Sequence, residues 1–192
     1  MEELNYFKEG WHHIISKDAL DHQLFILALA AIYTLFEWRQ VLILVTAFTI
    51  GHSITLALST LNIITIPTDL VEFLIPCTIV ITAVTNLFQK NFTPKAIRLN
   101  YFLALFFGLV HGLGFANTLR FIKAPDESLG WVLLQFNLGL EAGQILVVIV
   151  ILLIAYLFLT VLKVPRREWI LFVSGGVFAL AIKMVLERLP WL

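Results

Sequence analysis

The stretch ILVVIVILLIAYLFLTVL, residues 145–162, decides the fold because it holds no charged residue over a length that can cross most of a membrane. A helix rises about 1.5 Å per residue, so roughly 20 apolar residues span the hydrocarbon core. The rest of the chain is similar: 60% of its 192 residues are hydrophobic and 14% are charged, against about a quarter in soluble domains. We therefore predict an all-α, polytopic membrane protein.

Apolar segments bounded by charged residues or proline predict about six transmembrane helices in one bundle, which form a single membrane domain over residues 1–192. The predicted segments are 20–37, 40–60, 69–89, 97–119, 130–162 and 168–188. All five tryptophans fall at segment ends, where aromatic belts form. Lys and Arg are more numerous in the loops after the first, third and fifth segments, which predicts that both termini lie outside the cytoplasm.

Composition excludes several other classes of protein. The chain has 13 basic and 13 acidic residues, so no nucleic-acid partner is predicted. A single cysteine, Cys77, cannot form an internal disulfide framework. The beginning, MEELNYFKEG, has no short apolar core before a small-residue cleavage site, so no cleaved signal peptide is expected.

A few ionisable residues lie inside the predicted spans, where they are costly and usually functional. His22 is at the outer end of the first segment, and His52 and His111 are each about eight residues, or ~12 Å, from the outer end of theirs. Glu141 is about eleven residues, or ~16 Å, from the same side. Although these helices run in opposite directions, all four residues reach the outer half of the bilayer.

Neighbouring residues support this group. Asn137 and Gln144 share a helical face with Glu141, because their spacing is i, i+4 and i+7. Ser53 follows His52, and glycines flank His111 and allow close approach of another helix. Imidazole and carboxylate suit divalent Ni, Co, Zn or Fe, whereas Cu(I) prefers sulfur ligands, of which this chain offers only Cys77, Met1 and Met184. A bound or transported divalent metal ion is therefore expected.

The stretch GWHHIISKDALDH, residues 10–22, precedes the first apolar run and adds four candidate ligands: His12, His13, Asp21 and His22. Less specific interpretations exist for each. The two adjacent histidines could be solvated surface residues, and Asp21 could cap the helix that follows. Intramembrane His and Glu residues could also serve only to hydrogen-bond neighbouring helices.

Four motifs resemble the HupE/UreJ family of hydrogenase and urease accessory membrane proteins. They are GWHHI…DHQLFILAL at 10–29, FTIGHSITLAL at 48–58, FGLVHGLGFA at 107–116 and FNLGLEAGQ at 136–144. The resemblance implies an integral protein of the bacterial inner (cytoplasmic) membrane associated with nickel, and here a divergent branch without a signal peptide. By this similarity the metal-handling residues are His13, Asp21, His22, His52, His111 and Glu141, with His12, Ser53, Asn137 and Gln144 in support.

Two classes of function remain open from the sequence. The first is a membrane transporter of Ni²⁺, or of Co²⁺, although only Asn86, Asn100 and Thr160 suggest a polar path through the inner half. The second is an intramembrane zinc-dependent enzyme, such as a hydrolase or a lipid- or protein-modifying enzyme, with Glu141 or Asp21 as acid/base. A metal-sensing or accessory subunit is a third alternative. Besides lipid and metal, a second copy of the chain or an accessory protein could be a partner.

Overall fold

The computed structural model describes residues 5–88, 94–123 and 126–189, and within these ranges it contains helices and no strand. The last residue of the predicted segment 69–89 lies outside these ranges. The helices are α1 (Tyr6–Ile15), α2 (Leu20–Ala30), α3 (Trp38–Thr60), α4 (Thr68–Phe88), α5 (Pro94–Gly114), α6 (Ala116–Ile122), α7 (Leu129–Tyr156) and α8 (Arg166–Glu187). Three short helical turns join them: η1 (Lys17–Ala19), η2 (Leu35–Glu37) and η3 (Leu157–Val161), the last a π-helix.

Long apolar helices confirm the prediction of an all-α membrane protein. Among the described residues, four continuous helical stretches are long and apolar enough to cross a membrane: Leu35–Thr60, Thr68–Phe88, Leu129–Val161 and Arg166–Glu187. The predicted segment 97–119 is instead a bent pair, Asn100–Gly114 and Ala116–Ile122, with an angle of 47° between its parts. Counting that pair as one span makes five, against the predicted number of about six.

The first predicted segment, 20–37, differs most from the structure. Its helix, α2, has 11 residues and a length of about 17 Å, which is too short to cross a bilayer alone. The chain then begins a new helix at Thr34, whose backbone N–H and hydroxyl both donate to Glu37 Oε2, at 2.8 and 2.9 Å. This capping box makes residues 35–37 the beginning of the second span and not the end of the first.

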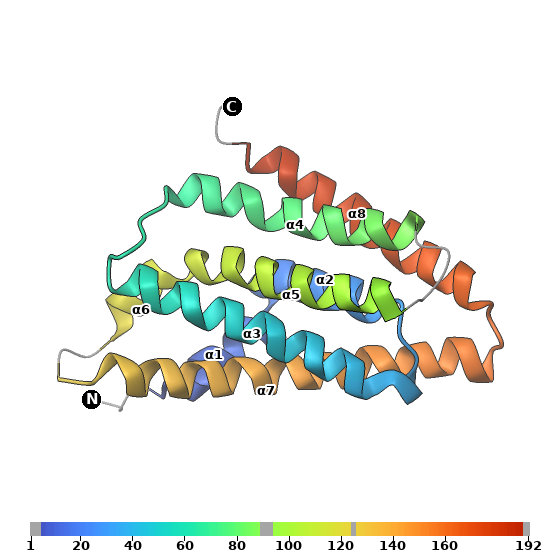
Figure 1. Ribbon diagram of the computed structural model, residues 1–192, viewed down its shortest axis with the longest axis horizontal. Helices are drawn as coiled ribbons and strands as arrows, with labels where there is room; N and C mark the ends of the chain where they lie inside the picture. The colour runs from blue at the N-terminus through green and yellow to red at the C-terminus, as the bar shows by residue number, and fades with distance from the viewer. Residues whose placement is uncertain (1–4, 89–93, 124–125, 190–192) are drawn as a thin grey trace.

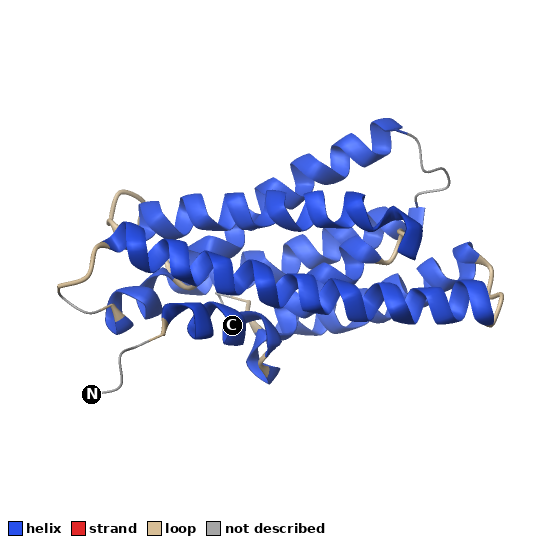
Figure 2. Cartoon of the chain, turned by 90° about the horizontal axis from the view of Figure 1, so that it is seen from below, coloured by secondary structure: helices blue, strands red, loops and turns tan. Residues whose placement is uncertain are grey.

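The long helices run side by side, and loops gather at the two ends of the bundle (Figures 1 and 2). Helix α3 packs against α5, α1 against α7 and α4 against α8. We name the two ends by their loops: the α3–α4 end, on the left of Figure 1, and the α2–α3 end, on the right. The sequence predicts that the α3–α4 end faces away from the cytoplasm.

Glycines bring α3 and α5 into backbone contact, as expected from the sequence around His111. A Cβ atom on Gly108 would collide with the carbonyl oxygen of Phe48, and one on Gly112 would collide with that of His52. Only glycine permits this approach. The contact holds the helix that carries His52 against the helix that carries His111, so that both rings are buried in the same interior.

Candidate metal centre

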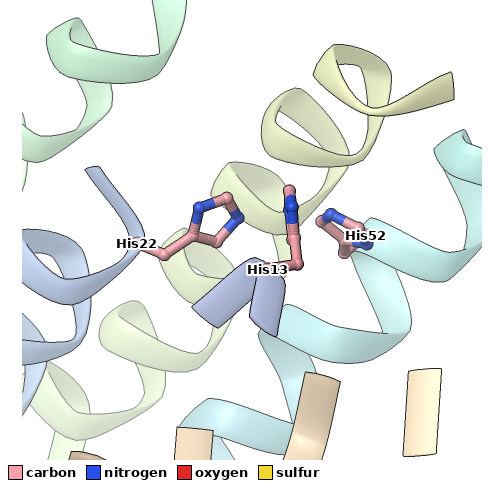
Figure 3. Close-up of side chains that lie close together, drawn as sticks. All are labelled: His13, His22 and His52. Carbon is pink, nitrogen blue, oxygen red and sulfur yellow. The ribbon is translucent and has the colours of Figure 1, made fainter. Parts of the chain in front are cut away.

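Three imidazoles from three different helices meet near the α3–α4 end. His13 is on α1, His22 on α2 and His52 on α3, and one ring nitrogen of each lies within 4.8 Å of the others. Figure 3 shows the three rings turned toward one another. Imidazoles gathered in this way match the donor set that divalent transition metals favour.

The ring nitrogens of these histidines are unusual because they are buried and lack partners. His13 Nε2, His22 Nε2 and both nitrogens of His52 accept or donate no hydrogen bond within the described part of the chain. Leaving a buried polar atom unsatisfied costs about 1–3 kcal/mol. Several such atoms at one point indicate a site that a ligand completes, and a metal ion would satisfy all three rings at once.

Asp21 determines which nitrogen of His22 is available. The carboxylate accepts hydrogen bonds from the backbone N–H of His22, at 2.8 Å, and from its Nδ1, at 3.0 Å. Because Nδ1 therefore carries the proton, the lone pair lies on Nε2, which is the nitrogen without a partner. A carboxylate that orients a metal-binding histidine in this way is a common arrangement.

His111 lies beside the group, and its ring carries the proton on the same nitrogen as that of His22. Its Nδ1 donates to the carbonyl oxygen of Phe107, at 2.8 Å, which leaves the lone pair on Nε2. That nitrogen is also buried and has no partner among the described residues. The ring centroids of His111 and His22 are 5.1 Å apart, so a fourth imidazole adjoins the three.

The packing of helix α1 gives the adjacent residues His12 and His13 different environments. It packs on α7 through backbone contacts at Gly10 and Gly139, where a Cβ atom would collide with Phe136 and Phe7. This packing turns His13 inward and leaves His12 exposed. Burial, and then the neighbouring His22, lower the pKa of His13 well below its usual value, so its ring is neutral and able to bind a metal at neutral pH.

A pocket of about 300 Å³ leads to the group from the α3–α4 end. His13, His22 and His111 lie in its wall, together with exposed Asp18. The charged residues that line it are Asp18, Asp21, Glu72 and Arg188. Three carboxylates against one guanidinium give a negative surface, which attracts cations.

Glu141 and Gln144, predicted to belong to the site, are bonded to α3 instead. Thr46 Oγ1 donates to Glu141 Oε1 at 2.7 Å, and Thr49 Oγ1 donates to Gln144 Oε1 at 2.8 Å. Glu141 is not a member of the three-histidine group. The regular spacing of these two bonds, one helical turn apart, indicates that they join α3 to α7.

Two other predicted supporting residues, Ser53 and Asn137, bond within their own helices. Ser53 Oγ donates to the Thr49 carbonyl oxygen at 2.6 Å, and Asn137 Nδ2 donates to that of Leu133 at 2.8 Å. The structure therefore brings together four of the predicted histidines and Asp21. It leaves His12 exposed and places the other predicted residues in contacts between or within helices.

Arg188 is a member of the site that the sequence did not reveal. It begins the segment after α8, and its Nη1 lies 3.7 Å from Asp21 Oδ2, on the carboxylate that holds His22. The two residues are far apart in the chain, and no local pattern links them. The Thr34–Glu37 capping box, by contrast, has a recognisable sequence signature that the span assignment overlooked.

These features define an integral membrane protein with a buried histidine centre open to one end of the bundle. A protein-family model described as HupE / UreJ protein matches residues 1–188, so the chain belongs to the HupE/UreJ family. This confirms the resemblance seen in the four motifs. No curated protein and no solved structure matches the chain.

Proposed function

We propose that this protein carries a divalent transition-metal ion, Ni²⁺ or Co²⁺, across a bacterial inner membrane. The observation that carries the proposal is the convergence of buried, unpartnered nitrogens from His13, His22 and His52 at the end of an acidic pocket. Membership of the HupE/UreJ family supports a role in metal handling. The positive-inside pattern of the loops predicts that the pocket opens on the outer side.

The donor set suits an ion that must enter and leave. The carboxylates of the pocket attract the hydrated cation, and neutral imidazoles replace part of its water shell. Neutral ligands leave the charge of the ion uncompensated, which favours moderate over very tight binding, as transport requires. Asp21 contributes its charge through His22, whose Nδ1 it holds at 3.0 Å. His111, adjacent to His22, is available as a further ligand.

The alternative is an intramembrane zinc-dependent hydrolase that uses the same histidines, since the pocket also admits water from one side. Such an enzyme needs a carboxylate free to act as acid/base. Asp21 is bonded to His22 and lies near Arg188, and Glu141 accepts a hydrogen bond from Thr46. Neither of the two carboxylates predicted as acid/base is therefore free, which favours the transporter.

Metal binding and flux, measured on the same purified protein, test the proposal. Equilibrium dialysis with Ni²⁺ gives the stoichiometry, and proteoliposomes containing a metal-sensitive dye give the rate of uptake. We expect one ion per chain and saturable uptake that His52→Ala abolishes. Ile54→Ala is the matched control, because Ile54 is exposed on the same helix.

The possible results separate the alternatives. Stoichiometric metal with no flux in the wild-type protein would overturn transport and favour the enzyme or a sensing subunit. The absence of both metal and flux would overturn the metal centre itself.

A further inference from the structure

Two cavities lie along the same three helices, α2, α4 and α5. The first is the acidic pocket, to which these helices contribute His22, Ile75 and His111. The second, of about 10 Å³, is nearer the α2–α3 end and is lined by Leu29, Thr82, Thr85, Asn86, Asn100 and Leu103. The shared helices place both cavities on one line through the bundle.

One layer of side chains separates the two cavities. On α2, Phe25 lies between His22 of the first cavity and Leu29 of the second. On α5, Phe107 lies between His111 and Leu103 in the same way. Each of these steps is three or four residues, or about one helical turn of 5.4 Å. The distance from the histidines to the second cavity is therefore about two turns.

The separating layer is apolar and closed. The rings of Phe25 and Phe107 have centroids 5.7 Å apart and are 0% and 1% exposed. Phe48, one turn from His52 on α3, packs against Phe25 at 5.0 Å, and Ile79 closes the layer from α4 with 0% exposure. Apolar constrictions of this kind stop ions because water does not fill them.

The second cavity is lined by two leucines, Leu29 and Leu103, and by four neutral side chains that carry oxygen. Thr82 Oγ1 donates its proton to the Thr78 carbonyl oxygen at 2.9 Å, so the lone pairs of the hydroxyl can still face a cation. Asn86 donates through Nδ2 to the Ala28 carbonyl oxygen at 2.7 Å, a bond that does not use its amide oxygen. No carboxylate lines this cavity among the described residues. Such oxygens hold a divalent cation weakly, which suits passage.

We infer that the cavity at Thr82, Asn86 and Asn100 is a second, transient station for the transported cation, and that Phe25 and Phe107 form the gate between it and the histidines. This inference rests on the proposed transport function and adds to it the route through the second half of the bundle. In the closed arrangement the ion reaches the histidines from the α3–α4 end, and movement of the two phenylalanine rings opens the way to the second station.

Removal of one hydroxyl tests the station. Thr82→Val keeps the shape of the side chain and deletes one oxygen, so Ni²⁺ uptake into proteoliposomes should fall about tenfold, as expected for the loss of one polar contact. Ni²⁺ binding at the histidines, measured by equilibrium dialysis, should not change. Thr82→Ser restores the hydroxyl and should restore uptake.

Thr60→Val is the matched control for this experiment. Thr60 is buried and donates to the carbonyl four residues earlier, as Thr82 does, but it lines neither cavity. Its substitution should leave uptake unchanged. Phe107→Leu tests the gate: the smaller side chain should raise uptake severalfold with unchanged binding.

The outcomes distinguish the station from the transport function. If the wild-type protein transports Ni²⁺ and His52→Ala abolishes it, but Thr82→Val transports normally, the second station is wrong and transport stands. If Thr82→Val and Thr60→Val lose uptake equally, the effect is structural and the station is again overturned. A wild-type protein without uptake overturns both proposals.

Discussion

The two ends of the bundle differ in how some of their polar side chains are bonded. At the α2–α3 end, Arg166 donates to the carbonyl oxygen of Ile32 and also pairs with Glu37 at 2.9 Å. At the α3–α4 end, nitrogens of His13, His22, His52 and His111 face one another without hydrogen-bond partners in the described structure.

The contrast separates structural polar residues from functional ones. At the α2–α3 end the side chains satisfy backbone groups where α2 stops and the next helix begins. They therefore supply the hydrogen bonds that a helix end lacks. At the α3–α4 end the cost of burying imidazoles is not recovered within the described protein, and a bound metal ion would recover it. An ionisable residue in a membrane protein therefore indicates function most strongly where the surrounding protein leaves it without a hydrogen-bond partner.

The largest expected effect is at His13, and the adjacent His12 provides the control. His13→Ala removes a ligand and should weaken Ni²⁺ binding by more than about 100-fold, which is the upper end of what loss of an outer partner costs. His12→Ala, on the exposed side of the same helix, should leave the affinity unchanged. Isothermal titration of both variants checks this, and similar losses in the two would show that α1 does not present His13 alone.

Next in size is the change at the carboxylate behind His22. Asp21→Asn cannot accept as strongly from Nδ1, so the preferred tautomer of His22 is lost and Ni²⁺ affinity should fall about 10- to 100-fold. Asp18→Asn is the control, because Asp18 lines the same pocket and has no hydrogen bond to His22 recorded in the structure. Equal losses in the two variants would assign the effect to pocket charge and not to orientation of the ring.

At the other end of the bundle the expected effect is on stability. Glu37→Ala removes the partner of Arg166 and the cap of Thr34, and should lower the free energy of unfolding by about 1–3 kcal/mol. Ni²⁺ affinity should not change. Thermal unfolding in detergent measures the loss, with Glu187→Ala as control, since its ion pair with Lys183 is exposed. Loss of metal binding in Glu37→Ala would contradict the separation of the two ends.

The smallest effect is expected at Glu141. Its carboxylate accepts from Thr46, and Glu141→Gln preserves an oxygen for that bond, so Ni²⁺ affinity should stay within about threefold of the wild type, less than half of a tenfold step on the free-energy scale. Dialysis with Ni²⁺ checks this. A loss comparable to that of Asp21→Asn would show that Glu141 approaches the ion, as the sequence predicted.

Much of the fold could be predicted because membrane insertion depends on composition along the chain. The apolar run at 145–162 lies within one long helical stretch, Leu129–Val161, as expected. The first segment could not be placed correctly, because α2 and the beginning of the next helix form one apolar run in the sequence. The cap at Thr34 separates them, and it depends on two side-chain hydrogen bonds.

The sequence by itself determined the membrane class, the family and the histidines, since lipid requires apolar helices and makes each intramembrane imidazole conspicuous. Only the tertiary structure decided which polar residues share a centre. It brought in His13 but not His12, bonded Glu141 to Thr46, and placed Arg188 beside Asp21. The physical reason is that depth along a helix follows from counting residues, whereas the direction of a side chain depends on how the helices pack.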